Sequence, residues 1–272
     1  MSIITITTDL GYRDSYLAMV KGVLYSKLPQ VNIVDLACDI TKHNHKDGVF
    51  ILRNALPFFP ENTIHLFAIK LMGDKKSMLS RDIDNTRYLM TKYKNQYIIC
   101  PDNGVFHSLD KEFNETVYQL YFDNISQHVF YLRDIFTEVA VKMIHQVPLT
   151  EFCTPVEDYC KIYSTECYAT PSNLQGQVLY IDDFGNLITN ITKHDFEKHV
   201  GNKKFSISLP GGTIDKINNT YDDVKVGDLV CFFNSSNYLE IALQGDEAGK
   251  ITLNRNMFEK YKIDKIIIDI YD

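Results

Sequence analysis

SIITITTDLGYRDSYLAMVKGVLYSKLPQVNIVDL, residues 2–36, decides the fold. Residues 2–8 are rich in β-branched side chains and alternate, which predicts a strand. Residues 15–28 carry apolar side chains at helical spacing, and Pro29 ends that helix. Residues 31–36 predict a second strand. A strand, a helix and a strand in this order are typical of α/β proteins, in which consecutive strands run parallel.

The same alternation continues toward the middle of the chain. The further elements predicted are a helix at 47–56, a strand at 64–69, a polar hairpin-like region at 73–96, a strand at 97–100 and a helix at 133–146. Alternating strands and helices at this spacing predict an α/β domain with a mainly parallel sheet.

The pattern changes after about residue 150. An irregular stretch with two prolines reads as a linker, and from Gln175 onward the signals are short strands and turns, with one short helix at 193–199. We therefore predict two domains. The first is an α/β domain at residues 1–165, and the second is a smaller, all-β, barrel-like domain at residues 172–272.

Composition excludes several functional classes. The chain has 272 residues and a net charge of −7, with no basic stripe, which argues against nucleic acid as a partner. No apolar run approaches the roughly 18–20 residues of a membrane span, and the N-terminus lacks the features of a signal peptide. The sequence thus predicts a cytoplasmic protein that does not bind membranes.

The six cysteines form no CxxC pair. Cys153, Cys160 and Cys167 are evenly spaced, but structural zinc sites use closer pairs and a fourth ligand. We therefore predict reduced thiols and no metal.

Polar residues follow four of the predicted strands, where ligands bind in open α/β sheets. These residues are Asp9, then Asp35 and Asp39, then Lys70, then Asp102 and Asn103. A carboxylate at position 9 suits the two donors of a vicinal diol such as ribose, but a turn or N-cap aspartate explains it equally well. PDNG, residues 101–104, is favoured in turns.

The second domain carries two polar clusters, DDFGN (182–186) and NSSNYLE (234–240). Both are plausible turns. Phe184 stands out between acidic and amide residues, because such a ring can stack on a flat ligand. The residue pattern alone predicts a polar cleft for a small polar molecule.

Taken together, seven motifs resemble a known family over nearly the whole chain. They are TTDLGYRDSYLAMVKGVL (7–24), VNIVDL (31–36) with Gly48 downstream, PFFPENTIHLFAI (57–69), CPDNGVF (100–106), FYLRDIF (130–136), GQVLYIDDFGNLITNI (176–191) and NSSNYLEIAL (234–243). In order and spacing they are similar to the S-adenosyl-L-methionine (SAM) hydroxide adenosyltransferases and their relatives, the fluorinases and chlorinases. The resemblance implies an α/β nucleoside-binding domain, a β-rich second domain, and a homotrimer with the ligand between subunits.

The resemblance also implies an activity and a binding site. Family members attack the ribose C5′ carbon of SAM with water, which gives adenosine and methionine, or with a halide. The resemblance implies no cofactor besides the ligand itself. By resemblance, Asp9 holds the ribose hydroxyls and Phe184 lies against the adenine. Asp182, Asn186 and Ser235 hold the methionine end and neighbouring polar atoms.

The catalytic positions depart from the family pattern. Lys70 stands where the water-using members have an aspartate, and Tyr131 stands where they have a histidine. The halide users have a tyrosine at that position followed by a small residue, which here is Leu132. We therefore expect an adenosyl-binding protein whose SAM cleavage is weak or altered and involves Lys70 and Tyr131.

Two alternatives remain open. One is a binding module or sensor for adenosine-type ligands, and the other is a structural trimer whose pocket is vestigial. Four further residues are either supports of the site or ordinary turn, helix-end and surface-pair residues: Asp14, Asp102, Asn103 and Arg133.

Overall fold

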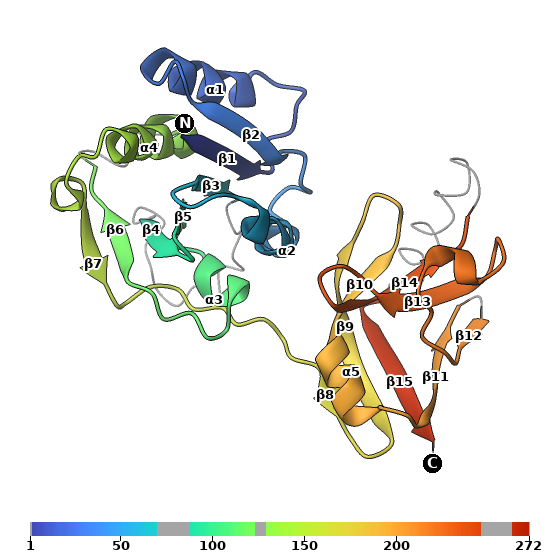
Figure 1. The fold of residues 1–272 in the computed structure, drawn as a ribbon. Coiled ribbons are helices and arrows are strands. Elements are labelled where there is room, and N and C mark those ends of the chain that lie inside the picture. Colours follow the sequence, from blue (N-terminus) through green and yellow to red (C-terminus); the bar gives the residue numbers. More distant parts are fainter. Residues whose placement is uncertain (1, 70–86, 123–128, 211, 246–262, 272) are drawn as a thin grey trace. The chain divides into compact units, whose positions relative to one another are not determined.

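The computed structural model describes residues 2–69, 87–122, 129–210, 212–245 and 263–271 (Figure 1). Lys70 lies outside the described residues. The chain divides into two compact units, Met1–Ser164 and Thr165–Asp272.

The N-terminal unit is built on a seven-stranded sheet in the order β2-β1-β3-β5-β4-β6-β7. Its strands are β1 (Ile3–Thr8), β2 (Asn32–Ala37), β3 (Ile64–Ala68), β4 (Tyr88–Tyr93), β5 (Gln96–Pro101), β6 (Val117–Leu120) and β7 (Cys153–Val156). Its helices are α1 (Tyr16–Lys27), α2 (His45–Ala55), α3 (Val105–Leu109) and α4 (Thr137–Ile144).

The prediction of a mainly parallel sheet is wrong, because the sheet is mixed. β1, β2, β3 and β5 pair in parallel, whereas β4, β6 and β7 join by antiparallel pairs. The physical reason is a tight hairpin between β4 and β5. Lys94 and Asn95 both have positive φ angles, 48° and 61°, and such a two-residue turn reverses the chain directly.

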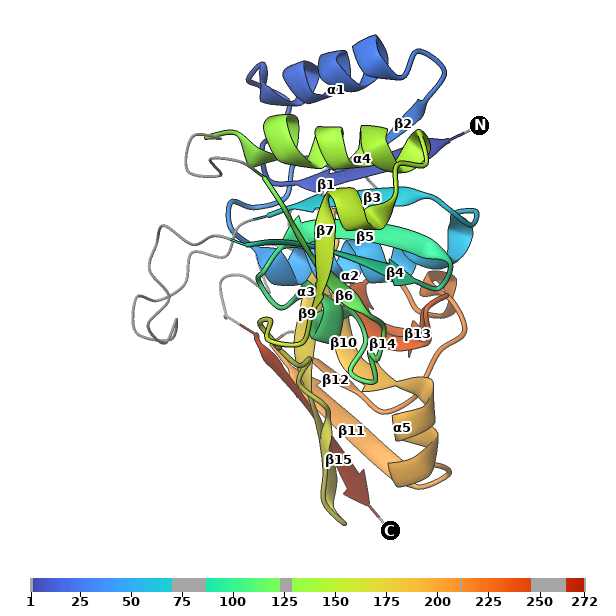
Figure 2. The ribbon, with the colours of Figure 1, turned by 90° about the vertical axis from the view of Figure 1, so that its left-hand side faces the viewer.

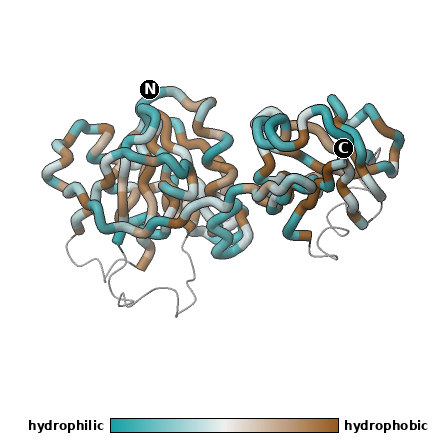
Figure 3. Tube along the Cα trace, turned by 90° about the horizontal axis from the view of Figure 1, so that it is seen from below, coloured by the Kyte–Doolittle hydropathy of each residue, from teal (hydrophilic) through white to brown (hydrophobic). Residues whose placement is uncertain are grey.

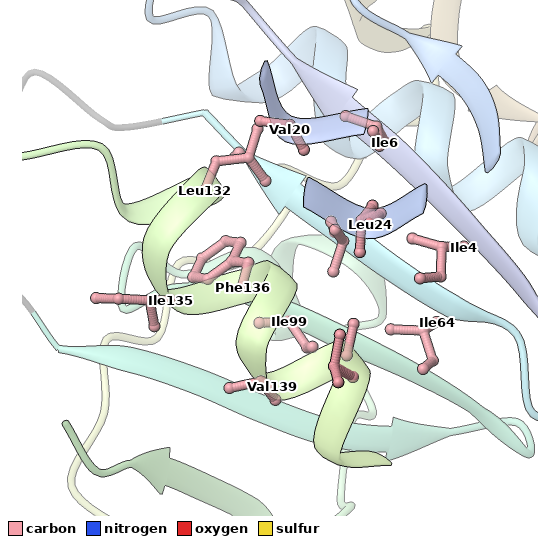
Figure 4. Close-up of a cluster of buried hydrophobic side chains, with 14 of the residues drawn as sticks. Ile4, Ile6, Val20, Leu24, Ile64, Ile99, Leu132, Ile135, Phe136 and Val139 are labelled. Atoms are coloured by element: carbon pink, nitrogen blue, oxygen red, sulfur yellow. The ribbon is translucent and has the colours of Figure 1, made fainter. Parts of the chain in front are cut away.

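Helices cover both faces of this sheet, with α1 and α4 on one side and α2 and α3 on the other (Figure 2). Each face has its own core because successive strand residues point to opposite sides. Ile64 and Leu66 of β3 pack under α1 and α4, and Phe67 packs under α2 and α3. Figure 4 shows the first of these cores, and in Figure 3 hydrophobic residues, in brown, recur on the central segments of the N-terminal unit.

Gly48 explains how α2 lies so close to the sheet. A Cβ atom at this position would lie 2.3 Å from Ile69 Cδ1 and 3.0 Å from the ring of Phe67. The close packing therefore depends on the absence of a side chain. This gives a structural reason for the glycine that belongs to the second sequence motif.

The C-terminal unit is an antiparallel, nearly closed, barrel-like sheet in the order β12-β11-β15-β9-β10-β14-β13, with β8 paired to β9. Its strands are β8 (Tyr168–Ala169), β9 (Asn173–Ile181), β10 (Leu187–Thr192), β11 (Lys204–Leu209), β12 (Gly212–Ile214), β13 (Leu229–Phe233), β14 (Tyr238–Leu243) and β15 (Lys265–Tyr271). The two end strands approach each other, since a Cβ on Gly212 would lie 3.6 Å from Leu229 Cδ1.

The predicted short helix is confirmed as α5 (Lys193–His199). It begins with a capping box, in which Thr192 and Asp195 each accept a hydrogen bond from the other's backbone N–H. The part of the chain that the structure describes contains no helix both long and apolar enough to cross a membrane.

Candidate functional site

Asp9 directly follows β1 and is held by the loop that follows β2. Its side chain is 13% exposed, and its Oδ2 accepts a hydrogen bond of 2.8 Å from the backbone N–H of His43. Lys42 Nζ donates to the backbone oxygen of Asp9. A carboxylate offers about four acceptor positions, so one loop amide leaves capacity for two hydroxyl donors. The geometry suits a diol.

Tyr131 immediately precedes a π-helical turn, Leu132–Phe136, that leads into α4. Its ring stacks on Tyr88, with 5.2 Å between centroids, and meets the edge of Phe136 at 5.3 Å. Burial raises the pKa of the Tyr131 phenol, and the negative charge of Asp9 raises it further. The structure thus brings Tyr131 and Asp9 within electrostatic reach. The hydroxyl stays protonated at neutral pH, so it can donate a hydrogen bond but cannot act as a base.

Asn103 supports the chain just before position 70. It is 4% exposed, and its Nδ2 donates a hydrogen bond of 2.7 Å to the backbone oxygen of Ile69. Its Oδ1 is buried and has no hydrogen-bond partner among the residues that the structure describes. Asn103 therefore fixes the main chain at the end of β3, which is a supporting role.

The other three candidate supports differ from Asn103. Asp102 accepts hydrogen bonds from Arg87 (Nη2, 2.6 Å) and from the backbone N–H of Cys160 (2.7 Å), so it fastens the segment after β7 to the sheet. Arg133 forms a two-point ion pair with Asp134. Asp14 is exposed. Asp102 and Arg133 have structural partners that account for their positions.

In the C-terminal unit, Asp182 and Asn186 close the turn between β9 and β10. Asp182 Oδ1 accepts from the Asn186 backbone N–H (2.8 Å), and Asp182 Oδ2 accepts from Asn186 Nδ2 (3.0 Å). Gly185, with φ of 85°, makes this turn possible. The turn leaves Phe184 63% exposed, so a flat ring can stack on it.

Ser235 lies in the turn between β13 and β14 and is exposed. Asn234 organises this turn, because its Oδ1 accepts from the backbone N–H groups of Ser236 (3.0 Å) and Tyr238 (3.2 Å). Asn237 adopts a positive φ of 62°. The turn is thus fixed by a side chain next to the predicted ligand-binding serine.

Two residues that sequence reasoning did not single out connect these turns. Tyr221 donates a hydrogen bond to Glu240 Oε1, and Tyr221 Oη accepts from Asn186 Nδ2 at 3.2 Å. Glu240 Oε2 accepts from Asn234 Nδ2 at 3.1 Å. The sequence held one signal for Glu240, because a carboxylate stands within the apolar run of β14. It held no signal for a role of Tyr221.

Among the described residues, no three His, Cys, Asp or Glu side chains are grouped so as to hold a metal ion. The two sets of groups described above are instead rich in oxygen acceptors. Such acceptors suit the hydroxyl and ammonium donors of a small polar ligand.

Two family models match the chain, one in each unit. The model for the SAM hydroxide adenosyltransferase N-terminal domain matches residues 4–153, and the model for the C-terminal domain matches residues 176–255. Together they account for both units in the order expected of this family.

Curated relatives are similar over most of their length. An (R)-S-adenosyl-L-methionine hydrolase of Methanocaldococcus jannaschii is 26% identical, and the match covers 97% of this chain and 96% of that relative. The hydrolase of Thermus thermophilus is 24% identical over 89% of this chain and 91% of the relative. A fluorinase of Actinopolyspora mzabensis is 25% identical, with 88% and 90% covered.

Solved structures share the fold. The crystal structure of an uncharacterized conserved protein from Thermotoga maritima superimposes with a TM-score of 0.77 at 24% identity, covering 98% of this chain and 99% of that one. The two family models span 4–153 and 176–255. The chain belongs to the SAM hydroxide adenosyltransferase family.

Proposed function

We propose that this protein binds SAM and cleaves it at the ribose C5′ carbon with water, which releases adenosine and methionine. The observation that carries the proposal is the match to both family domains, together with relatives named SAM hydrolases that are similar over most of the chain. The acceptor-rich groups at Asp9 and at the Asp182 turn support it. The substrate itself supplies the leaving group, so the proposal needs no cofactor.

Asp9 and Phe184 bind the nucleoside in this proposal. The carboxylate of Asp9 accepts both ribose hydroxyls, and the exposed ring of Phe184 stacks on the adenine. Ser235 contributes an exposed hydroxyl from a turn that Asn234 holds in place.

Asp182 and Asn186 bind the amino acid end of the substrate. Both hydrogens of Asn186 Nδ2 are used, by Asp182 and by Tyr221, so the side chain has only its Oδ1 acceptor left to offer. Two neighbouring acceptors, one of them charged, suit the primary ammonium of methionine.

In the reaction, a water oxygen forms a bond to C5′ while the C5′–sulfur bond breaks, and methionine leaves as a neutral thioether. The water must lose a proton. Tyr131 stays protonated, so it orients the water by a hydrogen bond. We propose that Lys70, in its neutral form, accepts this proton. A charged lysine about 5 Å from the positive sulfonium of SAM would be repelled by roughly 3 kcal/mol at a dielectric near 20. The sulfonium therefore favours the neutral form of the lysine. Leu132 occupies the place of the small residue of the halide users, which disfavours a halide.

Replacing Lys70 tests this assignment. We expect Lys70→Ala to reduce the rate of adenosine formation at least tenfold, because a positioned general base contributes on the order of 10²–10⁴ in rate. Initial rates at saturating SAM provide the measurement. Lys193→Ala, at a surface ion pair of α5, is the matched control. An unchanged rate in Lys70→Ala would remove the role given to this residue.

The second candidate is binding of adenosine-type ligands without cleavage. It is favoured by the aromatic cluster around Tyr131, which holds a protonated phenol where the family uses a histidine. Mass spectrometry after a long incubation with SAM, in chloride and in chloride-free buffer, separates the two functions. Adenosine formed by the intact protein and not by Asp9→Ala supports hydrolysis. Ligand recovered unchanged with the protein supports binding alone.

We further propose that the chain forms a homotrimer, as the family resemblance implies. Support comes from α1 and the loop before it, where four large side chains are between 43% and 60% exposed: Tyr12, Tyr16, Met19 and Tyr25. Large exposed apolar side chains on one element are typical of interaction surfaces. Light scattering on the purified protein is expected to give about three times the chain mass of 31.4 kDa, and a mass of one chain contradicts the proposal.

A further inference from the structure

Glu240 is a buried carboxylate in a setting that does not otherwise suit a charge. It is 5% exposed, and its partners in the neighbouring strands are Ile188 of β10 and Phe232 of β13. A carboxylate among apolar neighbours is costly unless both of its oxygens are hydrogen-bonded. Here they are, by Tyr221 on Oε1 and by Asn234 on Oε2.

The first arm of this network runs to the turn between β9 and β10. A carboxylate only accepts hydrogen bonds, so the Tyr221 hydroxyl must point its hydrogen at Glu240. The Tyr221 oxygen is then an acceptor, and it takes an N–H of Asn186 at 3.2 Å. This fixes which end of the Asn186 amide faces Tyr221. The Nδ2 group lies toward Tyr221 and Asp182, and Oδ1 is turned away from them.

The second arm runs to the turn between β13 and β14. The Nδ2 group of Asn234 donates a hydrogen bond to Glu240, so the Oδ1 atom of Asn234 must face away from Glu240. That oxygen accepts the backbone N–H groups of Ser236 and Tyr238. The orientation of this amide, and with it the shape of the turn that carries Ser235, is therefore set by the same carboxylate.

We propose that Glu240 is a positioning residue that sets the amide orientation in both turns, so that Asn186 presents its carbonyl oxygen beside Asp182 to a primary ammonium group of the ligand. The inference rests on the proposed function and deepens it. Glutamine at position 240 has the same shape but brings an NH₂ group, which would face either Tyr221 or Asn234. One of the two arms must then reverse or break.

The test compares two ligands that share the nucleoside and differ in the amino acid end. S-adenosyl-L-homocysteine carries the ammonium group, and 5′-methylthioadenosine lacks it. We expect Glu240→Gln and Tyr221→Phe to weaken binding of the first ligand at least tenfold and of the second less than threefold, as measured by calorimetry. A residue with only a structural role would weaken both alike. Glu197→Gln, an exposed glutamate on α5, is the matched control and is expected to change neither.

Tyr221→Phe breaks only the first arm, so it decides the question if Glu240→Gln fails to fold. An unchanged ratio of the two affinities in Tyr221→Phe overturns the proposal. If the wild-type protein binds neither ligand, the proposed function fails, and the network is tested without ligand. Exchange of the Asn186 side-chain amide hydrogens, followed by NMR, is then expected to speed up at least tenfold in Tyr221→Phe. No change in exchange overturns the positioning role.

Discussion

Asp9→Ala is expected to weaken binding of SAM and of adenosine by roughly 100- to 1000-fold. Hydrogen bonds to a charged group contribute about 1.5–3 kcal/mol each, and two ribose hydroxyls lose such a partner together. The carboxylate is only 13% exposed, so water replaces it poorly. The variant also loses the acceptor of the His43 backbone N–H, which loosens the loop after β2.

Asp9→Asn separates these two effects. An asparagine oxygen can still accept the His43 N–H, but the charge is gone, so we expect an intermediate loss of about tenfold. Calorimetry with adenosine gives the affinities. Glu138→Gln, at a surface ion pair with Lys27, serves as the control and is expected to bind normally.

A second ligand makes the ribose role specific. The wild type is expected to bind 2′-deoxyadenosine about tenfold more weakly than adenosine, because one charge-assisted hydrogen bond is missing. In Asp9→Ala that preference should vanish. A preference that persists in Asp9→Ala, or an unchanged affinity for adenosine, rules out the contact between Asp9 and the ribose.

The sequence predicted the first strands and helices well for a physical reason. β1 and β3 are buried on both faces and α1 carries a regular apolar spacing, so the local pattern already determines each element. The mixed sheet was missed because the direction of β4 depends on the left-handed conformation of Lys94 and Asn95. The dipeptide Lys-Asn is not one of the sequences that are typical of such a turn.

The site was only partly accessible to sequence reasoning. Asp182 and Asn186 are close in the chain and were correctly associated with one turn, and their hydrogen bonds follow from it. The orientation of the Asn186 amide depends instead on Tyr221 and Glu240, which approach it only through the pairing of strands far apart in the sequence. The π-helical turn after Tyr131 likewise has no local signature.

Two of the buried histidines, His65 and His45, are expected to make the folded N-terminal unit sensitive to acid. The Nδ1 atom of His65 accepts a hydrogen bond of 2.7 Å from the hydroxyl of Thr5. Its Nε2 atom donates a hydrogen bond of 2.6 Å to Gln96 Oε1. Gln96 uses its Nε2 to donate to the backbone oxygen of Leu56, so its Oε1 is the acceptor that His65 Nε2–H requires. This arrangement fits the neutral ring. Burial lowers the pKa of His65 to about 4, although the hydrogen bond that its Nε2 donates to Gln96 opposes the shift.

His45 is neutral for a simpler reason. It is 4% exposed, its ring meets the edge of Phe67, and its buried Nε2 has no hydrogen-bond partner within the described part of the chain. Burial lowers its pKa to about 4, with a smaller contribution from Lys46. Among the residues that the structure describes, no group accepts a hydrogen bond from Nε2 of this ring, so a second ring proton would be left unpaired.

Stability is therefore expected to fall as the pH drops from 6.5 to 4. In that window the unfolded chain binds protons on both histidines and the folded chain does not, so protonation favours unfolding. At pH 7.5 and above, these histidines are almost fully deprotonated in both states and the effect is absent. With a folded pKa near 4, each histidine removes about 2–3 kcal/mol of the free energy of unfolding by pH 4.5.

His45→Leu isolates one of the two contributions. At pH 7.5 we expect its free energy of unfolding to equal or exceed that of the wild type by up to about 1 kcal/mol, because an unpaired buried polar atom is removed. Between pH 7.5 and 4.5 it should lose about 2 kcal/mol less than the wild type. Urea unfolding at both pH values gives the difference, in which the carboxylates common to both proteins cancel. The exposed His145, replaced by glutamine, should leave the acid dependence unchanged. If His45→Leu and the wild type lose the same stability on acidification, the buried neutral state of His45 is not what makes the fold acid-sensitive.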